Sequence, residues 1–497
     1  MAYHFISVLG TSLYEPVRYS FDGAAGEVQE YIQLALIDAY KEELKTPDAQ
    51  ISVIMTDKAR KSNWDNRRLT ERDCETMSKW RGEQAERSFG EEKSGLEVQF
   101  KQQFPELISH RQEVSIDDPG DADSIWKLFN KIYDTLRPGD EIIFDITHSF
   151  RSIPMLAISV INYAKILKNC SLKGIYYGAY EAAKEEPELG KVAPIVDLTL
   201  YNDILEWTNA ANVFMKLGNA SLIKETFDQT YGNLAAGPGE SARSYQKALK
   251  PLRNMVDAAV CLSDTIQTSR GAGAAGLSNK NARERKRSSI QAAVSNYLEK
   301  CEQQPEGEVK ELTPAYKLLE KTREAYAGLN KEENYRTGIQ VTHWCIDHGM
   351  TQQGYTALEE SVITYVCHKY GVNDTELEMR EDVVSWAISG MGKALENKQE
   401  DSISFKLETP EDRKAYFESD QKKYLSEKLS PEYKELAEDI FVTIDMDIVK
   451  LVKGIKYYRN DINHFGMRKN PKTPDDLREK LKEYLGKFEE LEGREGR

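Results

Sequence analysis

Short apolar runs alternate with longer amphipathic stretches through roughly the first 200 residues. β-strands are predicted from runs rich in Ile, Val, Phe and Tyr at 4–9, 50–56, 113–116, 141–146, 172–179 and 193–199. Helices are predicted where apolar residues recur at helical spacing, over 26–43, 121–136 and 152–168. Strands that alternate with helices are typical of a mostly parallel sheet with helices on both faces. The pattern therefore predicts an α/β domain over residues 1–205.

The alternation is interrupted once and then ends. Residues 57–108 are crowded with Lys, Arg, Glu and Asp and show little periodicity, so we interpret them as a charged insertion rather than as part of the core. Beyond residue 205 the strand patterns stop, and helical periodicity continues to the C-terminus. We expect a helical connector over 206–330 and an all-helical domain over 331–497.

Composition narrows the class of protein. With 497 residues, 40% of them hydrophobic and 30% charged, the chain has the composition of a soluble protein with several domains. It has neither an apolar run long enough to cross a membrane nor a basic segment at its start, so we expect a cytoplasmic protein. The six cysteines form no CxxC pair and are expected to be reduced thiols. The net charge of −15 disfavours a general DNA-coating surface but allows a small recessed basic site.

Two polar clusters follow predicted strands of the α/β domain. Ligands bind open parallel sheets at the carboxyl ends of the strands, where the strand order reverses. The helix that begins after the second cluster offers free N–H groups suited to phosphate, and a histidine there could stack on a base. GxGxxG and P-loop motifs are absent, so neither a dinucleotide cofactor nor ATP hydrolysis is indicated. The candidate ligand-binding residues are Gly10, Thr11, Ser12, Thr147, His148, Ser149, Phe150, Arg151 and Ser152. The alternative is a hydrogen-bonded structural turn.

A third polar cluster interrupts an apolar helical stripe near the C-terminus. In 446–466, Arg459 falls near the middle of the stripe, where it costs free energy unless it is paired, packed across an interface or in a wet cleft. His464 lies about 140° further around an ideal helix, so the two side chains would not meet. Either the helix deforms around Asn460 and Asp461, or a second copy of the chain completes the site.

The chemistry of an arginine and a histidine suits RNA cleavage. Histidine can transfer protons near neutral pH, and arginine can stabilise the negative charge of a phosphoryl transition state. Because RNA carries its own nucleophile, the 2′-hydroxyl, such a pair could cleave it without a metal.

The segment around His343, Cys345 and His348 invites a metal interpretation. The two histidines are five residues apart, which does not place them on one helical face, and no second cluster with ligand spacing is near. We therefore favour core packing of a helix and expect no metal site.

Particular stretches of the sequence resemble known families. "GTS" after the first strand, "DITHSFRSIP" and "GIYYGAYE" resemble the CARF domain, a Rossmann-like sensor associated with CRISPR systems. "YRNDINHFG" resembles the R-x4-6-H motif of HEPN ribonuclease domains. Their order and spacing resemble the CARF–HEPN accessory ribonucleases of type III CRISPR systems.

The resemblance implies a specific activity. The protein would form a homodimer or larger homo-oligomer whose CARF domains bind a cyclic oligoadenylate, with the tetra-adenylate ring as the expected activator. The residues after the two strands would line the ring, and Arg459, Asn460 and His464 of two chains would cut single-stranded RNA without a metal or other cofactor. No membrane partner is implied.

Two other functions are compatible with parts of this pattern. One is a sensor or adaptor that binds the same ligand and uses a HEPN-like bundle only to dimerise; the intact Arg459 and His464 pair favours the nuclease. The other is a transcription regulator, which the acidic charge and the long C-terminal helical region disfavour.

Overall fold

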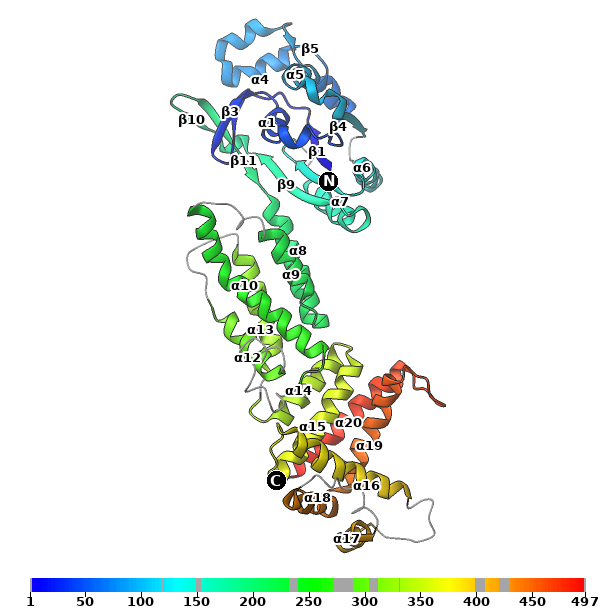
Figure 1. Ribbon diagram of the computed structural model, residues 1–497. Coiled ribbons are helices and arrows are strands. Elements are labelled where there is room, and N and C mark those ends of the chain that lie inside the picture. The colour runs from blue at the N-terminus through cyan, green and yellow to red at the C-terminus, as the bar shows by residue number, and fades with distance from the viewer. Residues whose placement is uncertain are drawn as a thin grey trace. The chain divides into compact units, whose positions relative to one another are not determined.

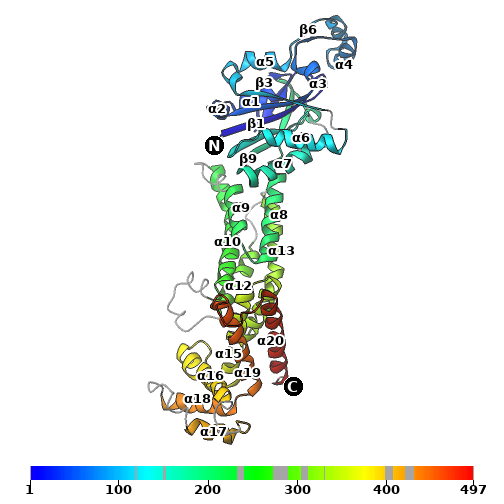
Figure 2. The same cartoon turned by 90° about the vertical axis from the view of Figure 1, so that its right-hand side faces the viewer.

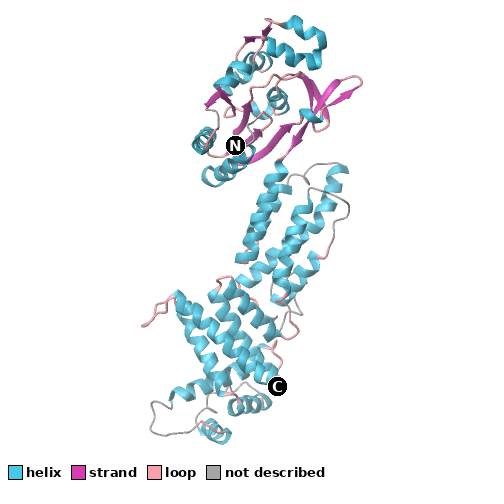
Figure 3. Cartoon of the chain, turned by 180° about the vertical axis from the view of Figure 1, so that it is seen from behind, coloured by secondary structure: helices cyan, strands magenta, loops and turns pink. Residues whose placement is uncertain are grey.

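The computed structural model describes residues 2–117, 120–148, 153–231, 240–271, 289–303, 312–329, 331–397, 407–419 and 430–495. The chain divides into two compact units, Met1–Asp203 and Ile204–Arg497. Figure 3 shows that the strands belong to the first unit, whereas the described residues of the second form helices and connecting loops. The predicted class, a mostly parallel sheet followed by an all-helical region, is confirmed.

A mixed, mostly parallel sheet forms the frame of the N-terminal unit. Its strands are β1 (Ala2–Leu9), β2 (Val17–Phe21), β3 (Ala24–Gln29), β4 (Gln50–Thr56), β7 (Arg111–Ile116), β8 (Asp140–Asp145), β9 (Ser171–Gly178), β10 (Lys184–Glu186) and β11 (Gly190–Asp197). The strand order is β3-β2-β11-β9-β8-β1-β4-β7, with β10 paired to β11. The segment from β9 through β8, β1 and β4 to β7 is parallel throughout, whereas β11 runs antiparallel to β9.

Helices cover both faces of this sheet (Figures 1 and 2). The helices of this unit are α1 (Ile32–Ala39), α2 (Lys41–Leu44), α3 (Asp57–Ala59), α4 (Glu71–Arg81), α5 (Leu96–Gln103), α6 (Ala122–Thr135) and α7 (Ile153–Lys168), with a π-helical segment at Arg60–Trp64 and 3₁₀ turns at Gly82–Ser88, Pro105–His110 and Tyr180–Ala182. Successive residues of β1 point to opposite faces, because strand side chains alternate. Phe5 packs in a core cluster with α1 and α5, and Ile6 packs in another with α6 and α7.

The predicted helix over 26–43 is wrong in its first part. Residues of β2 and β3 form a hairpin whose two-residue turn is Asp22-Gly23, and α1 begins only at Ile32. Both turn residues have positive φ, of 50° and 82°. Asp-Gly is a preferred dipeptide for such a turn, because aspartate and glycine tolerate this left-handed backbone.

The interpretation of 57–108 as lying outside the core is also wrong in part. Trp64, Leu96, Phe100 and Phe104 are buried and belong to the core cluster on one face of the sheet. The last three are four residues apart, which is helical spacing, and the charged residues of the segment hide that periodicity. A short hairpin of β5 (Arg67–Arg68) and β6 (Glu92–Lys93) lies in the same segment.

The second unit consists of helices around two hydrophobic clusters. The first cluster draws on α8 (Thr199–Leu217), α9 (Ser221–Tyr231), α10 (Glu240–Gln267), α12 (Ile290–Cys301), α13 (Thr313–Ala327) and α14 (Asn334–Asp347). The second draws on α14 together with α15 (Thr351–Lys369), the π-helical segment Met379–Ser385, α16 (Trp386–Asn397), α17 (Pro410–Ser419), α18 (Pro431–Thr443), α19 (Met446–Asn463) and α20 (Pro474–Glu495). The predicted boundary at residue 330 within this region stays a prediction. Among the described helices, none is long and apolar enough to cross a membrane.

Candidate functional site

The strand order of the N-terminal sheet reverses between β1 and β8. From β1 the chain continues to β4 and β7 on one side, whereas β8 and β9 lie on the other side. The carboxyl ends of β1 and β8 are adjacent, because Ser7 is in register with Asp145. Gly10–Ser12 and Thr147–His148 follow these two ends directly. Both predicted clusters therefore begin at the switch point, where open α/β sheets bind ligands.

The two loops touch each other. The ring of His148 stacks on the ring of Tyr14, with centroids 3.9 Å apart. A Cβ at Gly10 would lie 3.1 Å from the main-chain oxygen of His148 and 2.6 Å from the Tyr14 hydroxyl oxygen. Only glycine allows this approach without a shift of its neighbours. Gly10 therefore lets the two loops pack against each other.

A buried carboxylate fixes the start of the second loop. Asp145 accepts hydrogen bonds from the Ser7 hydroxyl at 2.6 Å and from the N–H and hydroxyl of Thr147 at 2.9 and 2.6 Å. Burial raises the pKa of Asp145, and these hydrogen bonds oppose the rise. The Thr147 hydroxyl also accepts the Gly178 N–H at 2.8 Å. Thr147 thus shapes the loop, and its hydroxyl is already engaged.

Other groups at the ends of β1 and β8 are exposed or lack a hydrogen-bond partner. Thr11 and Ser12 are exposed. The Nε2 atom of His148 is buried and makes no hydrogen bond within the described part of the chain. Burial lowers the pKa of His148 to about 4, so the ring is neutral near pH 7. A neutral imidazole with an open nitrogen could exchange one hydrogen bond with a bound group. The predicted residues Ser149, Phe150, Arg151 and Ser152 lie outside the described residues.

Asn63 holds the first loop, although no motif or pattern around it singled it out. Its side-chain amide donates to the main-chain oxygens of Gly10 at 2.9 Å and Ser12 at 2.8 Å. The Asn63 oxygen accepts from Lys93, which forms a buried ion pair with Glu30 at 2.8 Å. Asn63 and Lys93 both come from the segment 57–108, so that segment supports the loop after β1.

The arginine in the apolar stripe of α19 has a partner. Nη1 of Arg459 lies 2.7 Å from Oε2 of Glu359 on α15, which packs against α19. The Glu359 side chain is 3% exposed and that of Arg459 is 25% exposed. Burial raises the pKa of Glu359, and the nearby Arg459 and Lys456 cations oppose this rise. Of the explanations open from the sequence, pairing is the one observed within one chain.

The sequence contained a signal for Glu359. It lies among the apolar residues Tyr355, Leu358 and Val362, which are buried on α15. An acid in one apolar stripe and a base in another are the residues expected to pair when two helices pack.

His464 is the C-cap residue of α19, directly after its last residue, Asn463. The helix stays regular through Asn463, so the first of the two alternatives, a deformation around Asn460 and Asp461, is not observed. The His464 N–H donates to the Asn460 main-chain oxygen at 3.0 Å, and the side chain of His464 is exposed. In the described part of one chain, no hydrogen bond joins the side chains of Arg459 and His464. A site that uses both would need a second copy or an RNA that spans them.

The histidines near residue 345 have ordinary structural roles. His343 lies 2.7 Å from Glu489, and His348 stacks on Trp344 with ring centroids 3.8 Å apart. Cys345 is buried in the core. Among the described residues, no group of three or more His, Cys, Asp or Glu side chains is placed to hold a metal ion.

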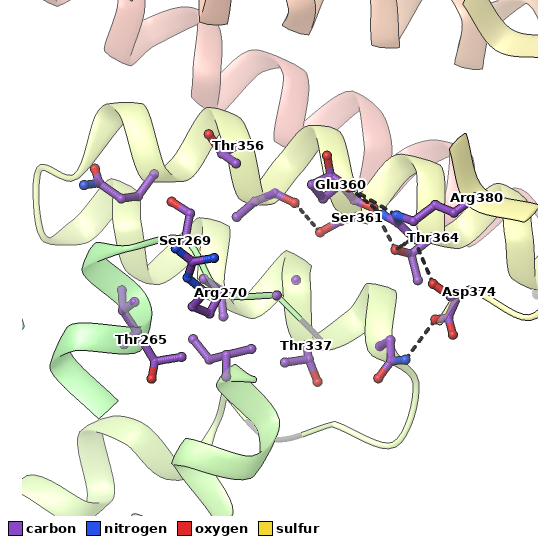
Figure 4. A pocket seen from close by; sticks show the side chains of 18 of the residues that line it. Thr265, Ser269, Arg270, Thr337, Thr356, Glu360, Ser361, Thr364, Asp374 and Arg380 are labelled. Carbon is purple, nitrogen blue, oxygen red and sulfur yellow. Dashed lines mark hydrogen bonds and ion pairs between the residues drawn. The ribbon is translucent and has the colours of Figure 1, made fainter. Parts of the chain in front are cut away.

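A pocket of about 350 Å³ lies on another face of α15 (Figure 4). Its lining includes the ends of α10 and α12 together with α14 and α15. The polar groups of the lining are largely satisfied: Ser361 and Thr364 donate to main-chain oxygens of α15, and Arg380 pairs with Glu360 at 2.7 Å. Adjacent residues of α15 thus have different partners, because Glu360 lines the pocket and Glu359 faces α19.

Comparison with known proteins supports the resemblance of the N-terminal unit to CARF domains. Residues 4–181 match the family model described as the CARF domain of the CRISPR system endoribonuclease Csx1. The chain is also 30% identical over 233 residues to the CRISPR-associated protein MJ1674 of Methanocaldococcus jannaschii. That match covers 44% of this chain and 34% of the relative's length. The predicted resemblance to CARF domains is confirmed for residues 4–181.

Proposed function

We propose that this protein is an endoribonuclease that cleaves single-stranded RNA when a cyclic oligoadenylate binds its CARF domain, as part of type III CRISPR defence. One observation of the helical unit carries the nuclease assignment. His464 is exposed, and Arg459 reaches solvent at 25% exposure although Glu359 anchors it. Both groups that the chemistry needs are therefore accessible to RNA.

The crevice between β1 and β8 is the proposed activator site. We assign Gly10, Thr11 and Ser12 to one side of this site, and Thr147 and His148, with the residues that follow them in the sequence, to the other. The exposed hydroxyls of Thr11 and Ser12 suit the phosphates of a ring of adenylates, and the buried Nε2 of His148 has no hydrogen-bond partner among the described residues. We expect the cyclic tetra-adenylate to bind across the two-fold axis of a dimer.

The proposed cleavage uses the 2′-hydroxyl of RNA as the nucleophile. His464 transfers the proton of this hydroxyl or of the leaving 5′-oxygen. Arg459 stabilises the extra charge on the phosphoryl oxygens, and Asn460 lies beside it in the sequence. The 2′-oxygen forms a bond to phosphorus while the bond to the 5′-oxygen breaks, which leaves a 2′,3′-cyclic phosphate and a 5′-hydroxyl. The reaction requires no metal.

The test is cleavage of a labelled RNA with each cyclic oligoadenylate in turn. His464→Ala should lower the rate by about 10²–10⁴-fold, the usual effect of losing a positioned acid or base. Arg459→Ala should remove most of the activity through lost charge stabilisation. Neither variant should change activator binding. His343→Ala, which removes an exposed histidine of the same unit, should cleave like wild type.

Two further measurements separate this mechanism from others. A substrate with a 2′-deoxy sugar at the scissile nucleotide should resist cleavage, and EDTA should leave the rate unchanged. Cleavage of the deoxy substrate, or loss of activity in EDTA, would contradict the mechanism. If the ring binds but no RNA is cut under any condition, the protein is instead a sensor or adaptor.

A further inference from the structure

The turn that follows α19 exposes large apolar side chains. Phe465 is 92% exposed, Met467 is 84% exposed, and Tyr457 on the last turns of the helix is 46% exposed. An apolar group of this size is usually covered, because leaving it in water forgoes the free energy of burial. This group lies directly beside His464.

The backbone holds Phe465 in this position. Phe465 and Gly466 both have positive φ, of 56° and 68°, and the Gly466 N–H donates to the Asp461 main-chain oxygen at 2.9 Å. A positive φ is uncommon for a bulky residue and costs free energy. Asp461 also accepts the Lys472 N–H at 3.0 Å, so the segment 465–472 is tied at both ends to the buried Asp461.

Cations lie among these apolar groups. The Arg468 guanidinium lies 5.6 Å from the centre of the Tyr457 ring and donates to the Tyr457 main-chain oxygen at 3.3 Å. Lys472 lies 5.8 Å from the same ring. Neither Arg468 nor Lys469 forms a salt bridge in the described part of the chain, and both are exposed. The segment 465–472 carries no acid, although the whole chain has a net charge of −15.

We propose that Tyr457 and the segment 465–472 bind single-stranded RNA beside His464. Bases stack on the Phe465 and Tyr457 rings, and phosphates contact Arg468 and Lys469. Exposed aromatic rings interspersed with cations that have no acidic partner are the combination by which proteins bind single strands without reading their sequence. This inference rests on the proposed ribonuclease function and names the surface that holds its substrate.

Charge favours RNA over a second copy of the chain as the occupant. In a two-fold contact the same surface is used on both copies. A two-fold contact pairs a residue with a different residue of the partner, and within 465–472 a second copy has no acid to offer Arg468 or Lys469, so these cations stay free for RNA even where a second chain completes the site beside His464. RNA supplies the opposite charge, and the acidic remainder of the protein offers it few alternatives.

The experiment measures binding of a 2′-O-methyl single-stranded RNA to the full-length protein. This RNA lacks the nucleophilic hydroxyl, so binding is measured without cleavage. Phe465→Ala should weaken binding by about tenfold, within the range for loss of one base-stacking ring. Phe465→Tyr, which keeps a ring, should bind like wild type. Leu377→Ala, which removes another exposed apolar side chain of the helical unit, should also have no effect.

The cations are tested through the salt dependence of binding. Arg468→Gln and Lys469→Gln should each reduce the slope of log affinity against log salt concentration by about 0.7, the contribution of one phosphate contact on a single strand. Lys414→Gln, in which the replaced cation lies elsewhere in the helical unit and is 59% exposed, should leave the slope unchanged.

The outcomes distinguish this proposal from its alternatives. Unchanged RNA affinity and salt slope in all three variants of the surface would overturn it. A shift of Phe465→Ala to a smaller oligomer in sedimentation, with RNA affinity retained, would also overturn it and identify a contact between copies. If wild type binds the RNA through these residues but never cleaves an unmodified one, the binding surface stands and the proposed ribonuclease function fails.

Discussion

Arg459 occupies a position of α19 where an apolar residue would normally pack, and Glu359 makes this possible. The pair places a guanidinium near solvent on an otherwise buried helix face. Glu359 is not expected to touch RNA, because its side chain is almost fully covered. In the proposed ribonuclease it would be a positioning residue, which acts on Arg459 through their ion pair.

Glu359→Gln should therefore affect both stability and cleavage. The substitution leaves the Arg459 cation without its buried counter-charge, so the free energy of unfolding in urea should fall by about 1–3 kcal/mol. Cleavage should fall as well, whereas activator binding should not change. Glu360→Gln is the matched control, because Glu360 is the next residue, is 48% exposed and pairs with Arg380 beside the pocket. Equal effects of the two substitutions would contradict a positioning role.

His148 makes the stability of the N-terminal unit depend on pH. Its pKa is lowered from 6.5 to about 4 in the folded protein, because burial disfavours the charged ring. The stabilising contribution is therefore fully present above pH 6.5 and is lost as the pH falls towards 4. His148→Phe keeps a ring against Tyr14 but cannot titrate. The unfolding free energy of the variant should lose this part of the pH dependence. Identical pH profiles for variant and wild type would show that His148 is not its source.

At the scale of elements, the segment 57–108 positions the loop after β1. Its buried face joins the core through Trp64 and α5, and this places Asn63 under the main-chain oxygens of Gly10 and Ser12. The charged face of the same segment explains why its amphipathic character is hard to detect. The conformation of the loop that follows β1 thus depends on Asn63, which lies more than fifty positions away in the sequence.

Asn63→Ala should weaken activator binding indirectly, because Asn63 supports the loop and is not itself expected to contact the ligand. Two main-chain oxygens would lose their donor, at a cost of about 1–3 kcal/mol, and the loop would no longer be held against His148. Calorimetric titration with cyclic tetra-adenylate should show the lower affinity, while RNA cleavage at saturating activator should persist. Ser78→Ala, at an exposed position of α4, is the control. Unchanged affinity in Asn63→Ala would mean that the loop does not contact the ring.

At the scale of the whole molecule, the proposed ribonuclease depends on oligomerisation, because the side chains of Arg459 and His464 form no hydrogen bond within the described part of one chain. Because α19 is regular up to Asn463, we propose that a second chain supplies one of the two groups of the site. We expect at least a dimer in sedimentation before the activator is added.

Mixed oligomers test whether two chains share one site. Arg459→Ala and His464→Ala should each be inactive alone. After the two proteins are mixed and allowed to exchange subunits, some dimers should retain one Arg459 and one His464, and cleavage should rise above that of either variant. A monomer in sedimentation, with and without activator, would rule out the shared site. Mixing wild type with buffer under the same protocol controls for losses during exchange.

The sequence alone determined where the elements and the polar clusters lie. Hydrophobic periodicity is a local property, so the runs at 50–56 and 141–146 were located to within a residue as β4 and β8. The polar residues that follow β1 and β8, and the arginine inside an apolar stripe, were visible for the same reason. The hairpin at Asp22-Gly23 was also encoded locally, and reading its turn signal would have corrected the predicted helix over 26–43.

Only the tertiary structure decided which of these features meet. Asn63 reaches Gly10 across 53 positions and Ser7 reaches Asp145 across 138, and helical or strand periodicity carries no information at such separations. The pairing of Arg459 with Glu359 likewise depends on which helices pack, which hydrophobic burial decides for the chain as a whole. A base in one stripe and an acid in another indicate that each needs a partner, but the packing of α15 against α19 selects it.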